Sequence, residues 1–170
     1  MKKIFLSIIL AISFLPVNGA KFQTLDNALA ETANKIAKDG NIPQNAKIAV
    51  VGFLETTTRG RCPVSSVIED DLSGFLISQM PSRVIAKNHI DTVLKELKIT
   101  RDDIFDTRNR KQFGKLASAD LLVSGNYWIN RQQVVIIINV VNIESGLGFF
   151  SHRVTIRRSQ FDKKLLEHCY

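Results

Sequence analysis

The stretch Lys47-Ile-Ala-Val-Val-Gly-Phe-Leu54 decides the fold of this chain. It is a nearly continuous apolar run, rich in β-branched residues, and this pattern is typical of a strand that is covered on both faces of an α/β sheet. A polar loop, Glu55–Pro63, follows the run directly. We therefore predict an α/β protein whose sheet contains this run as a buried strand.

Helical patterns lie on both sides of this strand. Thr24–Lys38 carries one apolar stripe at helical spacing. A second helix is expected to begin near Ser65 or Ser66, because Ser66 and Glu69 have the spacing of a capping box. Three further elements are predicted before the C-terminal half: a strand over Ser82–Lys87, a helix from about His89 to Leu97 and, after the charged connector Thr100–Asn109, a short helix that carries Phe113, Leu116 and Ala117.

The C-terminal half changes to strand patterns. Asp120–Asn130, Gln132–Ile143 and Gly148–Arg157 are predicted as three successive strands whose short turns suit antiparallel hairpins. Ser159 with Asp162 repeats the capping pattern and predicts a final helix. The expected order is α-β-α-β-α-α-β-β-β-α, a mixed α/β (α+β) fold with a single mixed sheet of about five strands and helices packed against it.

The first 20 residues have the pattern of a secretory leader. Lys2 and Lys3 precede an apolar run, Ile4–Leu15, and the small pair Gly19-Ala20 offers a cleavage site. The run is shorter than the roughly 20 residues that a helix needs to span a bilayer. We expect residues 1–20 to be removed and residues 21–170 to form one periplasmic domain. No cysteine follows the cleavage site, so no lipid anchor is expected.

The charge of the chain indicates which partners to expect. The formal net charge is +7 at pH 7, and the leader takes Lys2 and Lys3 with it. The remaining positive charge suits solubility and weak attraction to anionic surfaces, which allows peripheral association with the outer membrane. Export makes nucleic acid an unexpected partner. The longest other apolar run, Val134–Val141, is explained as a buried strand, so no transmembrane span is expected after leader cleavage.

The two cysteines, Cys62 and Cys169, lie far apart in the sequence. In an oxidising compartment they can form a disulfide that closes most of the domain. The alternative is two separate thiols, one in a loop and one beside the C-terminus, since spacing alone does not show that the sulfurs meet.

Residue types that carry catalysis lack the required spacing. In the loop Glu55–Pro63, Arg59 and Arg61 are the candidate binding residues. They precede a helix N-terminus, where an anion or a partner can bind. The alternatives are a solvated loop with no ligand and a nucleotide-binding loop, although the loop has no P-loop pattern. The histidines His89, His152 and His168 show no metal-ligand spacing. We expect no catalytic residue, no metal and no cofactor.

The last strand has a cationic face. Arg153, Thr155 and Arg157 alternate with His152, Val154 and Ile156. This face is expected to protect a sheet edge from unwanted pairing. Alternatively it meets an acidic partner or a membrane surface.

Five segments occur in an order that matches a known family: Ile48–Phe53, Ser82–Lys87, Ile90–Leu97, Phe113–Gly125 and Val140–Gly146. Together they resemble the FlgO/CsgG-type periplasmic domains, whose α/β fold is also seen at the front of TolB and in activator lipoproteins of peptidoglycan synthases. The resemblance implies a non-enzymatic FlgO-like protein that assists assembly or stability of an envelope structure through contacts with envelope proteins, with the flagellar outer rings as first candidate. The alternatives are an accessory or subunit of a curli-type secretion channel and an activator of peptidoglycan synthesis.

Overall fold

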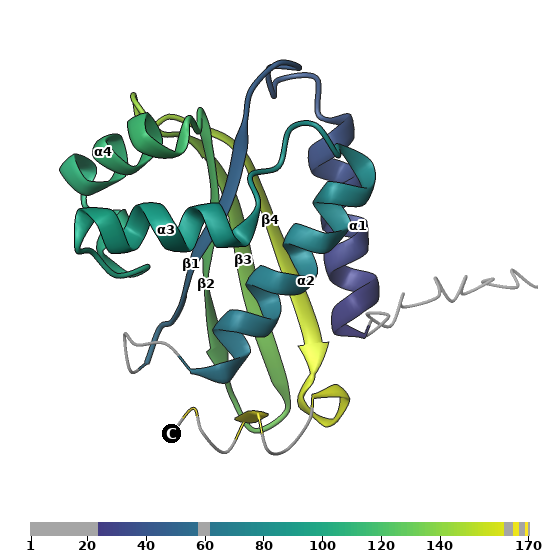
Figure 1. Ribbon diagram of the computed structural model, residues 1–170. Helices are drawn as coiled ribbons and strands as arrows, with labels where there is room; N and C mark the ends of the chain where they lie inside the picture. Colours follow the sequence, from purple (N-terminus) through teal and green to yellow (C-terminus); the bar gives the residue numbers. More distant parts are fainter. Residues whose placement is uncertain (1–23, 58–61, 162–164, 167–168, 170) are drawn as a thin grey trace, which may run out of the picture.

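The computed structural model describes residues 24–57, 62–161, 165–166 and 169, drawn in colour in Figure 1. The predicted leader and the residues Arg59 and Arg61 lie outside this part. The longer elements, in chain order, are the helix α1 (Leu25–Lys38), the strand β1 (Ile48–Glu55), the helices α2 (Pro63–Gln79), α3 (Lys87–Leu97) and α4 (Thr107–Ala117), and the strands β2 (Leu121–Ile129), β3 (Gln133–Asn142) and β4 (Gly148–Arg157). Two short 3-10 helices are η1 (Asp103–Phe105) and η2 (Arg158–Gln160).

The strands form one mixed sheet in the order β1-β2-β3-β4. β1 pairs with β2 in parallel, and the two pairs β2–β3 and β3–β4 are antiparallel hairpins. The predicted α/β class, the single mixed sheet and the order of elements are therefore confirmed. The sheet has four strands instead of about five.

The missing strand is the predicted strand over Ser82–Lys87. Only Val84 of this segment bridges the sheet, in parallel to Ile48. Ile48 bonds to the backbone of Arg83 and Ile85 at 2.7 and 2.8 Å, and the segment then leaves the sheet because α3 begins at Lys87. A strand forms when several of its residues pair with a neighbouring strand. Here only Val84 pairs with β1 before the chain turns into α3.

The predictions for the ends of two helices need correction. α2 begins at Pro63 with Cys62 as its N-cap, so the Ser66–Glu69 pair lies inside the helix and does not cap it. Proline suits the first helical position because the backbone N–H that it lacks has no helical partner there. The final helix predicted from Ser159 lies largely outside the described residues, and its first residues belong to η2.

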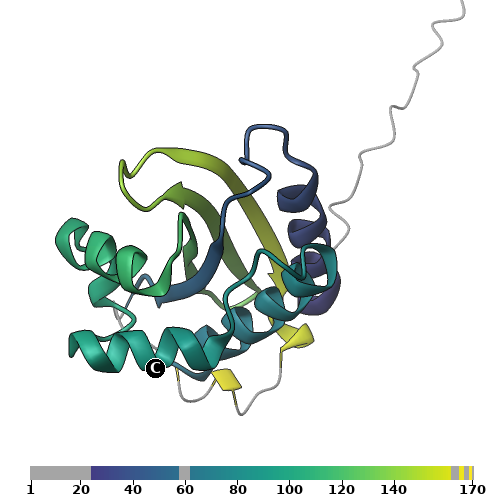
Figure 2. The same ribbon diagram turned by 45° about the horizontal axis from the view of Figure 1, so that its top comes forward.

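Helices cover both faces of the sheet, but unequally. α1 and α2 pack on one face, where they form an apolar core with the inward side chains of all four strands. α3, α4 and η1 pack on the other face, in a smaller core that draws its strand residues from β1, β2 and the end of β3. Figures 1 and 2 show α3 and α4 lying together on the β1 side, apart from α1 and α2.

Candidate protein-binding face

α3 and α4 leave about half of their side of the sheet uncovered (Figure 1). We call this uncovered part the open face. By strand register it consists of Asn126 and Trp128 in β2, Val135, Ile137, Asn139 and Val141 in β3, and Ser151, Arg153, Thr155 and Arg157 in β4. Of its apolar members, only Val141 packs against the core under α3 and α4. Most of a sheet face is thus left without a described helix above it.

A stacked pair lies in the middle of the open face. The guanidinium carbon of Arg153 lies 5.1 Å from the centroid of the Trp128 ring, which is the geometry of a cation–π contact. Trp128 pairs with Val135 across β2 and β3, and Val135 pairs with Thr155 across β3 and β4. Val135 is fully buried but belongs to neither core. Val135 is therefore buried by the neighbouring side chains of the open face and not by a helix.

Positive charge gathers at one end of this face. Arg131 lies in the turn between β2 and β3, and Arg158 bonds through its Nη1 to the carbonyl of Asn130 in the same turn at 3.2 Å. Arg153 and Arg157 lie on the adjoining strand β4. The sequence prediction of a cationic face on β4 remains a prediction about function, but the hairpins bring Arg131, Arg157 and Arg158 together at one end of the sheet, and Arg153 lies four residues before Arg157 on β4.

The other end of the open face is apolar. The β3–β4 hairpin exposes Leu147, whose relative exposure is 68%. Beside it, an open cavity of about 300 Å³ is lined by Asn139, Val141, Phe149 and neighbouring residues of β4. An apolar side chain of a partner can enter here.

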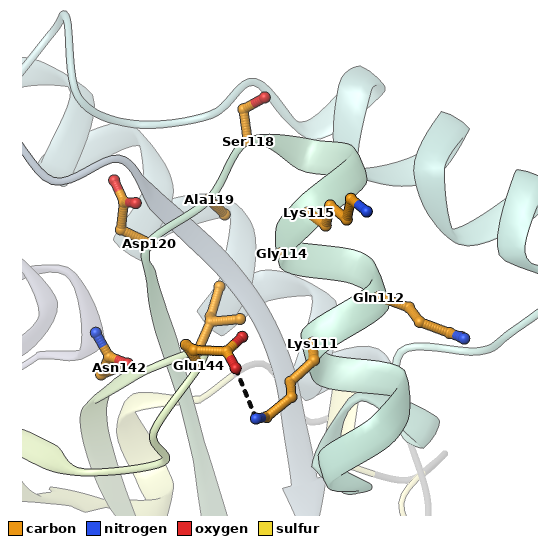
Figure 3. A pocket seen from close by; sticks show the side chains of 10 residues that line it. Lys111, Gln112, Gly114, Lys115, Ser118, Ala119, Asp120, Asn142 and Glu144 are labelled. Carbon is orange, nitrogen blue, oxygen red and sulfur yellow. Dashed lines mark hydrogen bonds and ion pairs between the residues drawn. The ribbon is translucent and has the colours of Figure 1, made fainter.

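A second hollow lies between α4 and the strand ends beside it, and Figure 3 shows it from close by. Its volume is about 610 Å³. Across it, Lys111 and Glu144 form an ion pair of 2.7 Å. Asp120 at its far end accepts a 2.8 Å hydrogen bond from the backbone nitrogen of Lys47. These charges already have partners in the chain, and the hollow has no arrangement typical of a catalytic centre.

The structure brings the two cysteines together. A disulfide joins Cys62 at the start of α2 to Cys169, with Cα atoms 5.1 Å apart and a sequence separation of 107. The hydroxyl of Tyr127 lies 2.9 Å from Sγ of Cys62 and 2.9 Å from Oγ of Ser65. Tyr127 is fully buried, so this contact connects the disulfide to the core of the sheet.

The histidines take no part in a metal site in the described ranges. There, no three residues of the types His, Cys, Asp and Glu come together as metal ligands would. His152 instead contacts α1, with Nδ1 2.9 Å from Oγ1 of Thr32 and Nε2 2.9 Å from Nζ of Lys35. Burial and the neighbouring Lys35 lower the pKa of His152 below its ordinary value, and Glu31 acts in the opposite direction. His168 lies outside the described residues.

Among the described residues, no helix combines the length and the apolar character that a bilayer crossing requires.

Comparison with solved structures identifies the fold. The LpoB C-terminal domain from Salmonella enterica superposes with a TM-score of 0.63 over 79% of this chain and 98% of that domain, at 9% sequence identity. The chain has an LpoB-like fold. LpoB of E. coli, determined by NMR, gives a TM-score of 0.63 over 93% of this chain and 80% of that one, also at 9% identity. Lipoprotein GNA1162 from Neisseria meningitidis gives 0.52 over 72% and 88%, at 16% identity.

No protein-family model matches the chain, and no curated protein matches its sequence. The LpoB likeness is therefore a likeness of fold.

The comparisons correct the family and the function predicted from the sequence. The resemblance to FlgO/CsgG-type domains is not supported, and the FlgO-like role at the flagellum was wrong, because the structural neighbours are LpoB domains. The quoted segments are strand ends and turns, which are similar in many α/β sheets and do not separate one family from another. The predicted release without a lipid anchor also finds no support, since GNA1162 is a lipoprotein.

Sequence reasoning missed the Trp128–Arg153 pair. The sequence pattern identifies Arg153 as part of a cationic strand face but does not connect it with Trp128. Their meeting depends on β3, which lies between the two strands. The available signal was the hairpin register, which places Asn126 and Arg153 on either side of Ile137.

Proposed function

We propose that this chain is a non-catalytic periplasmic protein that activates peptidoglycan synthesis by binding a peptidoglycan synthase. The observation that carries this proposal is the LpoB-like fold, which spans 98% of the LpoB C-terminal domain from Salmonella enterica. Among the functions expected from the sequence, the activator of peptidoglycan synthesis is the one that this likeness favours. The partner would be an envelope protein, in agreement with the expected export.

Two features of the molecule support a function that is performed by binding another protein. In the larger hollow, beside α4, the side chains of Lys111, Glu144 and Asp120 already have partners within the chain. The open face, in contrast, presents apolar and cationic side chains on a rigid sheet, which is a surface suited to another protein.

The proposal includes the compartment. Removal of residues 1–20 would release a domain of residues 21–170 into the periplasm, where the Cys62–Cys169 disulfide would form. Mass spectrometry of the protein purified from the envelope tests the cleavage site, the disulfide and any attached acyl chain in one measurement. The loop with Arg59 and Arg61 stays a prediction for anion or partner contact.

The decisive experiment uses the purified protein and the bifunctional penicillin-binding proteins of the same organism. Each synthase is assayed for glycan polymerisation and peptide cross-linking with and without an excess of this protein. We expect one synthase to bind the protein and to become faster. If no synthase binds it and no rate changes, the proposed function is wrong.

A further inference from the structure

We propose that the open face binds an acidic segment of a partner protein, with carboxylates at its arginine end and an apolar side chain at its Leu147 end. This inference rests on the proposed function, because it names the surface and the chemistry by which a synthase would be held. The occupant is a protein segment, and the argument for it comes from burial and charge.

Half-buried apolar side chains lie on the open face among polar ones. Ile137 lies between Asn126 and Arg153 in the register, and Trp128 lies beside Val135, yet no described helix covers them. The opposite face of the same strands is closed by α1 and α2, which bury Ile136, Ile138 and Ile156. One face of β3 and β4 thus has its apolar cover within the chain, and the other is left for a partner.

Charge identifies the chemistry of that partner. Between Leu121 and Phe161 the chain has four arginines and one acidic residue, Glu144. Glu144 is already paired with Lys111 on the α4 side. The described residues of the antiparallel half of the sheet therefore carry a net positive charge, which attracts carboxylates, and their one acidic side chain is paired on the α4 side.

Arg153 is prepared for a carboxylate by its position. Its guanidinium carbon lies over the Trp128 ring, and within the described part of the chain no ion pair joins it to a carboxylate. A guanidinium in contact with an aromatic ring can still donate two parallel hydrogen bonds to one carboxylate. The contact with Trp128 also limits side-chain freedom, which reduces the entropy lost on binding.

The two ends of the face set the length of the segment. Gly148, at the hairpin, and Arg153 are five residues apart on β4, which corresponds to about 16 Å of extended chain. An extended segment of about five residues therefore reaches from Arg153 to the cavity beside Leu147. We expect a segment that carries Asp or Glu at one end and Leu, Ile or Phe near the other.

The experiment uses Trp128 as a reporter, because it is the only tryptophan of the chain. The protein is labelled with 5-fluorotryptophan, so that its ¹⁹F spectrum has one signal, from the open face. The purified synthase that passes the activity assay is added. We expect the signal to shift or broaden, and Arg153→Glu to weaken binding about tenfold or more. Leu147→Ser is expected to weaken it less.

The matched control is Lys95→Glu on α3. It makes the same change of charge at an exposed position on another element and is expected to leave binding unchanged. Thermal unfolding of each variant shows that it is folded. If Arg153→Glu is unfolded, Arg153→Gln replaces it.

The outcomes separate this inference from the proposed function. If a synthase binds but Arg153→Glu and Lys95→Glu bind equally well, the open face is not the site, although the function stands. If no synthase binds, the proposed function is wrong. Binding of an acidic segment by the open face is then tested with two synthetic peptides, one alternating Glu with Leu and one alternating Lys with Leu. A ¹⁹F shift by the acidic peptide alone, lost in Arg153→Glu, supports the face, and no shift overturns it.

Two other occupants are tested in parallel. Vesicles that contain anionic phospholipid are added to the labelled protein, and light scattering measures its mass. A ¹⁹F shift with vesicles that depends on Arg153 would show that the face binds a membrane. A dimer that Arg153→Glu dissociates would show that it binds a second copy. Either result would overturn the proposal of a partner protein.

Discussion

The carboxylate of Glu69 in α2 accepts a 3.0 Å hydrogen bond from the backbone nitrogen of Gly52 in β1. The same oxygen lies 3.3 Å from the backbone nitrogen of Phe53, and the other carboxylate oxygen lies 3.3 Å from Nη1 of Arg101. The register of β1 shifts between Val50 and Phe53, so the strand has a bulge here. A bulge leaves backbone N–H groups without acceptors in the neighbouring strand. Here the buried carboxylate of Glu69 accepts their hydrogen bonds instead.

This arrangement predicts that Glu69→Ala destabilises the fold. The substitution leaves two buried amides without their acceptor and removes one of the two carboxylates that pair with Arg101. We expect the free energy of unfolding to fall by about 2–4 kcal/mol. Urea denaturation followed by circular dichroism measures it. Glu96→Ala on the exposed side of α3 is the control, with an expected change within about 0.5 kcal/mol. Equal stability of the two variants would contradict the role of Glu69.

Gly125→Ala is expected to destabilise the sheet. A Cβ at Gly125 would lie 2.1 Å from the carbonyl oxygen of Ile137 and 2.8 Å from the ring of Phe53. We expect a loss of about 1–3 kcal/mol in the free energy of unfolding, because backbone must move. The matched substitution is Gly74→Ala in α2, where nothing lies within 4 Å of the added Cβ. It is expected to raise the stability by about 0.5–1 kcal/mol, and a loss there would show that the comparison is flawed.

The disulfide predicts a large effect of reductant. In the chain-entropy model, a loop of this length contributes about 4–5 kcal/mol to the free energy of unfolding. We expect the protein purified from the periplasm to lose stability of this order when reduced, and Cys62→Ser with Cys169→Ser to unfold at the same urea concentration as the reduced protein. A thiol assay on denatured, unreduced protein should find no free thiol. Two free thiols would show that the bond does not form in the exported protein.

His152 predicts a loss of stability in mild acid. Its pKa is lowered in the folded state by burial and by Lys35, so the unfolded chain binds a proton more readily than the folded chain does. Stability from this group is therefore complete above the ordinary pKa of 6.5 and falls as the pH drops below that value, towards the lowered pKa. Melting temperatures between about pH 5 and 8 measure the effect, in a range above the ordinary carboxyl pKa values.

The control for this pH dependence is the second described histidine. His152→Gln is expected to flatten the change in melting temperature below about pH 6.5. His89→Gln, at an exposed position on α3, is expected to retain it. If His152→Gln melts with the same pH dependence as the unchanged protein, the titration of His152 does not contribute to the stability in this pH range.

Local patterns were sufficient for most elements. Gly148–Arg157 was predicted with its observed bounds, and Thr24 of the predicted first helix is the N-cap of α1. Long apolar runs and helical stripes are repeated over many residues, so they outweigh single exceptions. Ser82–Lys87 failed because a strand depends on a neighbour as well as on its own residues, and the start of α3 leaves only Val84 beside β1.

Glu69 shows why local spacing was misleading at the site of a long-range contact. Its distance of three residues from Ser66 fits a capping box, and nothing in the neighbouring sequence contradicts this interpretation. The bulge of β1 that Glu69 serves lies 17 residues before it. A carboxylate in a helix can accept hydrogen bonds from amides at the start of its own helix or from amides of a neighbouring strand. Only the packing of α2 on β1 decides which of the two it binds.

The amino-acid sequence by itself determined the α/β class, the order of elements, the hairpins and the positive character of the C-terminal half, because these depend on periodicity and composition along short stretches. The tertiary structure alone decided which sheet face remains open, that Trp128 stacks with Arg153, and that Cys62 meets Cys169. Each of these joins residues that are far apart in the chain. Such contacts depend on strand order, register and helix placement, which arise from the packing of the whole domain.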